Sequence, residues 1–125
     1  MAAALSNIRV VDMSRVLAGP WAGQLLGDYG ADVVKVERPC VGDDTRQWGP
    51  PWLGAEEARE SAYFLSANRN KRSITVNLAS ERGQQVIRDL VANADVLLEN
   101  YKVGTMSRFG LGYDELTALN PGLVY

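Results

Sequence analysis

The sequence contains no histidine and a single cysteine, Cys40. Histidine is the commonest metal ligand and general base near neutral pH, and no imidazole is available here for either role. One cysteine cannot form an internal disulfide, which agrees with a reducing compartment. Zinc sites and Cys/His nucleophilic sites need more of these residues than the chain has. We therefore predict no metal site and expect a cytoplasmic location.

Long apolar runs and an excess of basic charge are also missing. No run approaches the ~20 residues that a membrane-spanning helix needs, and residues 1–7 do not resemble a signal peptide. Thirteen Lys and Arg stand against fifteen Asp and Glu, for a net charge of −2. Nucleic-acid-binding domains usually carry a basic excess or stripe. We expect neither a membrane nor a nucleic acid as a partner.

What remains is the composition of a globular domain, 46% hydrophobic and 22% charged, in which strand and helix patterns alternate. We expect helices at 21–29, 80–93 and 113–119, and strands at 8–12, 32–37, 73–77 and 95–99, with another beginning at 123. Alternation of this kind is typical of an α/β fold with right-handed parallel crossovers. The predicted fold class is α/β, with a Rossmann-like, mostly parallel sheet over residues 1–125.

Two segments depart from this regular pattern. Residues 39–62 are rich in Pro, Gly, Asp and Trp, and we expect an irregular loop, which at this length is uncommon unless it is functional. The apolar run at 123–125 reaches the last residue. Because an exposed strand invites aggregation, we expect the chain to be a truncated portion of a longer protein.

In open parallel sheets, ligands bind outside the carboxyl ends of the strands, so residues 13–20, 38–48 and 100–108 are where we look for a site. Glu37 at a strand end resembles the acidic residue of an NAD site. However, the first turn offers only Gly19 and Gly23, which does not match the glycine spacing of a dinucleotide fingerprint. The sequence therefore argues against NAD binding.

Basic residues occur near several strand ends: Arg38, the segment 68–72 and Arg108. Arginine offers a planar fork and lysine a point charge, which together suit a phosphate or diphosphate. They could equally be separate solvated charges, and the residues alone leave both interpretations open.

The order of several motifs is more specific than any one of them. They are VLAGP (16–20), LGDYGADVVKVERP (26–39), GDDTR (42–46), NRNKRS (68–73), ENY (99–101) and RFG (108–110). In this order they resemble the N-terminal region of class III (CaiB/BaiF-type) CoA-transferases. GDDTR followed by WGPP (48–51) looks most like the enzymes that use succinyl-CoA and a dicarboxylate.

The resemblance implies a fold, a reaction and a partner. It implies the N-terminal, CoA-binding portion of the large Rossmann-like domain of a homodimer whose subunits interlock as rings. Such enzymes transfer CoA from an acyl-CoA to a carboxylic acid through an aspartyl-CoA intermediate, without a metal. The nucleophilic aspartate of the family would lie beyond residue 125, so we expect no catalytic residue in this chain and no activity from it alone.

The resemblance also implies roles for particular residues. Arg38 would contact the 3′-phosphate region of CoA, Lys71 and Arg72 the nucleotide and diphosphate, and the backbone near Asn70 the adenine. Asn100 and Arg108 would hold the pantetheine and phosphate side, and Val16, Leu17 and Ala18 would approach the thioester. Formyl-CoA transferases have glutamine where Leu17 stands, which argues against oxalate or formate as substrate.

Two alternatives remain open at this point. An α-methylacyl-CoA racemase would share the Arg38 and Asn-Lys-Arg-Ser motifs but would transfer a proton at the α-carbon, and residues beyond 125 would decide between the two. A non-catalytic nucleotide-binding module is the third possibility.

Overall fold

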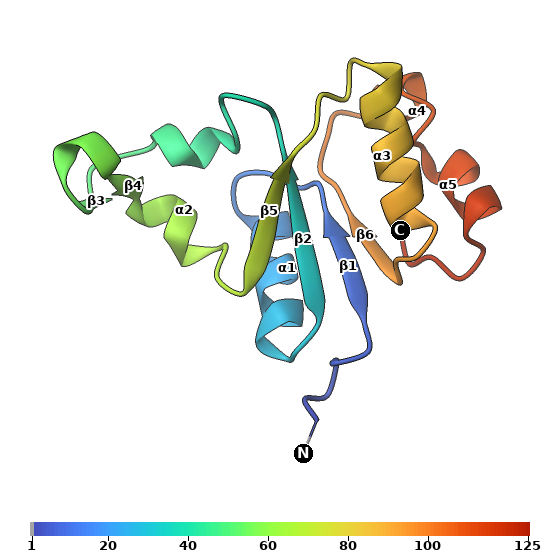
Figure 1. Ribbon diagram of the computed structural model, residues 1–125, viewed down its shortest axis with the longest axis horizontal. Coiled ribbons are helices and arrows are strands. Elements are labelled where there is room, and N and C mark those ends of the chain that lie inside the picture. The colour runs from blue at the N-terminus through green and yellow to red at the C-terminus, as the bar shows by residue number, and fades with distance from the viewer. Residues whose placement is uncertain (1) are drawn as a thin grey trace.

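The computed structural model describes residues 2–125, which form a four-stranded parallel sheet flanked by helices (Figure 1). The sheet strands are β1 (Arg9–Asp12), β2 (Asp32–Glu37), β5 (Lys71–Thr75) and β6 (Val96–Leu98), and the longer helices are α1 (Ala18–Asp28), α3 (Glu81–Val91) and α5 (Tyr113–Leu119). Shorter elements are η1 (Asp44–Gln47), β3 (Trp52–Leu53), η2 (Glu56–Ala58), β4 (Glu60–Ser61), α2 (Ala62–Ser66) and α4 (Thr105–Arg108).

The strand order is β5-β2-β1-β6, and every pairing in this sheet is parallel. Val124 forms a further parallel bridge with Val96, which adds the start of the expected last strand beside β6. The chain thus moves outward from β1 to β5 and then returns to the other side of β1. This reversal is the topological switch point of a Rossmann-like sheet, and it confirms the predicted fold class.

Neighbouring residues of β1 point to opposite faces of the sheet and enter two separate cores. Val10 joins Val33, with Leu26 of α1 packed against them. Val11 lies in the larger cluster, together with Ile87 of α3. Both valines are almost fully buried. Burial on both faces explains why β1 carries two adjacent apolar residues, Val10 and Val11, rather than an alternation of apolar and polar ones.

Helix α1 starts without a side-chain cap and stops at a glycine. Gly30, at φ +101°, follows the helix in a conformation that only glycine adopts readily. The Gly30 N–H donates to Gly27 O and the Ala31 N–H to Leu26 O, which is the Schellman arrangement. The predicted helix stop at Gly30 is confirmed, and the helix begins three residues before the expected Trp21.

The segment expected to be one irregular loop contains short ordered elements instead. Residues from η1 to α2 form an arm that extends away from the sheet, at the left of Figure 1. Ser61 donates to the carbonyl of Trp48 at 2.5 Å, and the ring of Trp48 meets that of Tyr63 edge to face. Short-range contacts of this kind leave little periodic signal in the sequence.

Strand β5 begins two residues earlier than expected, at Lys71, because its register with β2 pairs Val33 with Lys71 and Glu37 with Thr75. Residues 76–79 therefore lie beyond the strand. Helix α3 has the predicted Ser80 cap, whose side chain accepts from the Gly83 N–H. Among residues 2–125, no helix is long and apolar enough to cross a membrane.

Candidate ligand-binding site

A cleft of about 630 Å³ lies along the carboxyl edge of the sheet. Segments that follow all four strands contribute to it, as expected for a ligand site at the switch point of such a sheet. Its lining residues are Arg15, Arg38, Pro39, Val41, Val76, Asn77, Leu78, Ala79, Tyr101, Lys102, Thr105 and Phe109.

Three cationic side chains line this cleft, Arg15, Arg38 and Lys102, and none of the lining residues is acidic. The Asp44 carboxylate bridges the two arginines, with Arg38 Nη2 at 2.5 Å and Arg15 Nη1 at 3.4 Å. Burial raises the pKa of Tyr101, so this phenol stays neutral. With one carboxylate against three cations, the cleft suits an anionic ligand.

The turn after β1 is held from three sides. Asn100, after β6, accepts from the Arg15 N–H at 2.8 Å and donates to the Arg15 carbonyl at 2.7 Å. Lys35 Nζ donates to the Ser14 carbonyl at 2.9 Å. The Val16 N–H lies 3.3 Å from both oxygens of Asp43. These contacts hold Val16 at φ +73°, which costs a β-branched residue roughly 1–3 kcal/mol.

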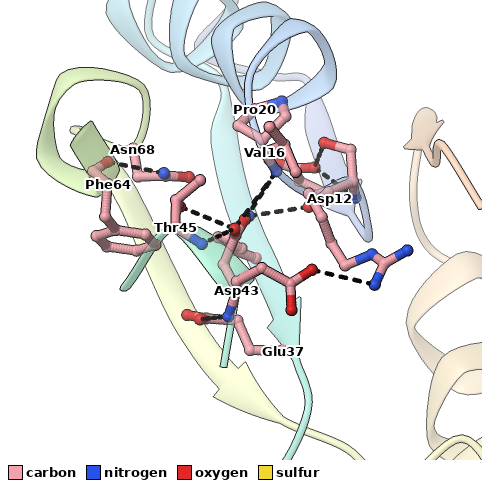
Figure 2. A network of polar contacts seen from close by, with 12 residues as sticks. Asp12, Val16, Pro20, Glu37, Asp43, Thr45, Phe64 and Asn68 are labelled. Atoms are coloured by element: carbon pink, nitrogen blue, oxygen red, sulfur yellow. Dashed lines mark hydrogen bonds and ion pairs between the residues drawn. The ribbon is translucent and has the colours of Figure 1, made fainter. Parts of the chain in front are cut away.

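Asp43 is the centre of a buried polar network, which Figure 2 shows between Val16 and Thr45. Its carboxylate lies 2.9 Å from Lys35 Nζ and accepts from the backbone and the hydroxyl of Thr45. Both members of the Lys35–Asp43 pair are almost fully buried. Burial alone would raise the pKa of Asp43, but the Thr45 and Lys35 contacts outweigh it and the pKa is lowered.

Glu37 extends the network at the end of β2. It accepts from Arg46 Nε and Nη2, both at 2.6 Å, from Ser73 at 2.6 Å and from the Asp43 N–H at 2.8 Å. Burial works to raise the pKa of Glu37, yet these donors lower it to about 2. Glu37 is thus a structural anion whose carboxylate oxygens accept from donors of the protein itself.

One predicted site residue lines this cleft, and another supports it from behind. Arg38 lines it, and Asn100 fixes the turn that carries Arg15. Val16, Leu17 and Ala18 directly follow Arg15 but are not among the lining residues.

The structure does not bring Arg38, Lys71 and Arg108 together in this cleft. Lys71 Nζ is buried beneath α1 against Asp12 at 2.8 Å and the Pro20 carbonyl at 2.6 Å. Burial lowers its pKa in spite of Asp12. Arg108 is exposed on α4, next to the lining residue Phe109 but outside the cleft lining.

Arg72 and Asn70 also lie away from the cleft. Arg72 pairs with Asp32 at 2.7 Å, and Asn70 donates to Asp28 at 2.8 Å. The physical reason is the position of the NRNKRS motif at the start of β5, because all starts of parallel strands lie at the edge opposite the ligand site.

Residues 76–79, and not residues 70–72, line the cleft beside Arg38. Other lining residues without a predicted role are Arg15, Thr105 and Phe109, whereas Tyr101 belongs to the ENY motif. Ligands bind outside the carboxyl ends of parallel strands, and this rule predicts residues 76–79 as well as 100–108 once the end of β5 is considered. Arg15 lies inside the selected segment 13–20 but carries no motif of its own.

Residues 5–125 match the sequence pattern of CoA-transferase family III. The chain belongs to this family. It is 50% identical over 121 residues to the succinyl-CoA:glutarate CoA-transferase of Mus musculus, and 50% identical over 123 residues to the succinate–glutarate CoA-transferase of Agrobacterium fabrum. Each alignment covers 97% of this chain but only 27% and 31% of the relative, so the chain spans less than a third of their length.

A solved CaiB/BaiF family protein from Brucella suis has the same fold, with a TM-score of 0.94 and 51% identity over 100% of this chain and 33% of that one. A short-chain dehydrogenase/reductase family protein superposes with a TM-score of 0.51 at 14% identity, over 94% of this chain and 50% of that one. That second likeness concerns the fold alone, and it agrees with a Rossmann-like sheet in a family III CoA-transferase chain.

Proposed function

We propose that this chain is the N-terminal, CoA-binding portion (residues 1–125) of an acyl-CoA:carboxylate CoA-transferase. The observation that carries the proposal is the cationic cleft at the switch point of the sheet, in a chain of this family. CoA carries three phosphates and an adenine, so its nucleotide end needs cationic groups beside apolar surface.

The lining residues fit such a ligand. Arg38 and Lys102 supply positive charge, while Val41, Leu78 and Phe109 supply apolar surface. In our proposal Arg38 contacts a phosphate, and the segment 76–79 packs against the nucleotide. Asn100 acts by holding the turn after β1. Asn70, Lys71 and Arg72 stay sequence-based candidates whose side chains face other parts of the molecule.

Four of the acidic residues near the cleft are already engaged with cations. Asp12 pairs with Lys71, Asp43 with Lys35 and Glu37 with Arg46, and Asp44 bridges the two arginines of the cleft. A carboxylate held by cations is a poor nucleophile. We therefore propose that the nucleophilic aspartate is none of these residues. Residues 1–125 alone would then have no CoA-transferase activity.

The substrates belong to the same proposal. The relatives from Mus musculus and Agrobacterium fabrum are named for succinate and glutarate, and a relative from Haloarcula marismortui for succinyl-CoA and mesaconate, at 48% identity. We propose succinyl-CoA as donor and a dicarboxylic acid as acceptor, in a homodimeric enzyme.

Binding of CoA tests the proposal directly. CoA at 100 times its dissociation constant should raise the free energy of unfolding by about 2.7 kcal/mol, measured by urea unfolding with and without ligand. Arg38→Ala should lose most of this gain, because a charge-assisted contact contributes roughly 1.5–3 kcal/mol. Arg9→Ala is the matched control, since Arg9 is exposed at the amino end of β1. If CoA raised the free energy of unfolding equally in the unchanged protein, Arg38→Ala and Arg9→Ala, this would contradict the assignment of CoA to the cleft.

A further inference from the structure

Arg15 is a cationic residue of the cleft that none of the sequence motifs contains. Its guanidinium carbon lies 4.8 Å from the ring centre of Tyr101, and both residues line the cleft. A cation over an aromatic face is attracted by the ring. The Tyr101 ring therefore steadies the guanidinium at the cleft wall.

The hydrogen-bonding capacity of Arg15 is largely unused. A guanidinium has five N–H donors, and the contact from Nη1 to Asp44 is long, at 3.4 Å, where a charge-assisted bond normally measures 2.7–2.9 Å. Within residues 2–125, Arg15 Nε is the one buried side-chain nitrogen or oxygen without a hydrogen-bond partner. Buried donors usually have partners, so a ligand group that accepts hydrogen bonds would complete this site.

The backbone beneath Arg15 is fixed on both sides. Asn100 binds its N–H and its carbonyl, Lys35 holds the Ser14 carbonyl, and Asp43 faces the Val16 N–H. The buried Lys35–Asp43 pair and the strained φ of Val16 both serve to hold this one short turn. An arginine in a solvated loop usually has fewer contacts fixing its backbone. Binding groups that are preorganised for a ligand are supported by such surrounding contacts.

Asp44 shows what kind of group the site accepts. It is an anion that contacts Arg15 and Arg38 at once, so the two guanidinium groups are close enough to share one anionic ligand group. Arginine pairs of this kind suit phosphate, whose several oxygens accept from both forks.

We propose that Arg15 is a ligand-contacting residue that donates, beside Arg38, to a phosphate of the CoA substrate. This inference rests on the proposed function. It assigns the cleft a second arginine and gives the buried Lys35–Asp43 pair and Asn100 the task of positioning it.

The test compares ligands as well as variants, in the full-length protein that carries this chain. CoA, 3′-dephospho-CoA and pantetheine are titrated by calorimetry into the unchanged protein, Arg15→Ala, Arg15→Lys and the control Arg9→Ala. We expect Arg15→Ala to weaken CoA about tenfold, the size of one charged contact, and to leave pantetheine, which has no phosphate, unchanged. Arg15→Lys should recover part of the loss because it keeps the charge. The ratio of CoA to 3′-dephospho-CoA affinity then reports which phosphate is held.

Steady-state kinetics give an independent reading. For Arg15→Ala, KM for the acyl-CoA should rise about tenfold while kcat changes less than twofold, because ground-state binding is what is lost. A merely structural Arg15 would weaken all three ligands alike, and that result would overturn the inference, as would CoA binding equal to that of Arg9→Ala. If the unchanged protein binds no CoA, the proposed function itself is wrong.

Discussion

At the scale of single residues, two adjacent aspartates have opposite environments. Asp43 is completely buried against Lys35, whereas the Asp44 side chain is 40% exposed between two arginines. Removing one member of a buried pair leaves the other charge without compensation inside the protein. Exposed pairs are screened by water and contribute little.

Asp43→Asn should therefore destabilise the protein by about 3–5 kcal/mol, because the buried Lys35 loses its charged partner. Asp44→Asn should cost less than about 1 kcal/mol. The measurement is urea unfolding at neutral pH, with both variants compared to the unchanged chain. Similar losses in the two variants would show that the Lys35–Asp43 pair does not carry the stability of the turn.

At the scale of elements, the start of α3 shapes the cleft wall. Ser80 caps the helix, and the Ser80 N–H donates to the Asn77 carbonyl at 3.2 Å. Gly83, one turn into the helix, lies against that same carbonyl, and a Cβ at this position would come within 2.0 Å of the Asn77 oxygen. The lining residues Asn77 and Leu78 can lie where they do because the helix has no side chain there.

Gly83→Ala should consequently destabilise the protein by about 1–3 kcal/mol, the usual cost of overpacking, although alanine is normally the better helix former. It should also weaken CoA binding, because relief of the clash moves the cleft wall. Gln85→Ala, on the exposed face of the same helix, is the control and should stay within about 0.5 kcal/mol. Thermal unfolding and CoA titration measure the two effects, and an alanine at 83 that stabilises the protein would refute the packing argument.

At the scale of the whole molecule, acid stability depends on carboxylates that the fold keeps ionised. The pKa of Glu37 falls to about 2 from 4.5, and the pKa values of Asp28 and Asp43 are also lowered. A carboxyl group with a lowered pKa stabilises the folded state above its unfolded pKa, and this contribution is lost as pH falls towards the folded value.

We predict that the contribution of Glu37, on the order of 3 kcal/mol, is complete above about pH 4.5 and disappears between about pH 4.5 and pH 2. Glu37→Gln should be less stable at pH 7, and its unfolding free energy should change less over that acid range. Urea unfolding at several pH values measures how the free energy of unfolding of each protein changes with pH. Parallel curves for the two proteins would contradict the assignment to Glu37.

The sequence by itself determined the order of the main elements. Helix α5 and strand β2 have the expected bounds, and the Ser80 cap and the Gly30 stop lie where local chemistry requires them. These features depend on neighbouring residues and on burial periodicity, which a linear pattern records. The parallel Rossmann-like sheet follows from the same alternation, and the motif order identified the family.

Only the tertiary structure decided which residues meet. Arg15, Arg38 and Tyr101 come from three strand ends far apart in the sequence, and their approach depends on sheet order and register. The same register places Lys71 beneath α1, where its Nζ binds Asp12 and the Pro20 carbonyl instead of lining the cleft. A count of basic residues near strands cannot distinguish the two edges, because it ignores whether each residue precedes or follows its strand.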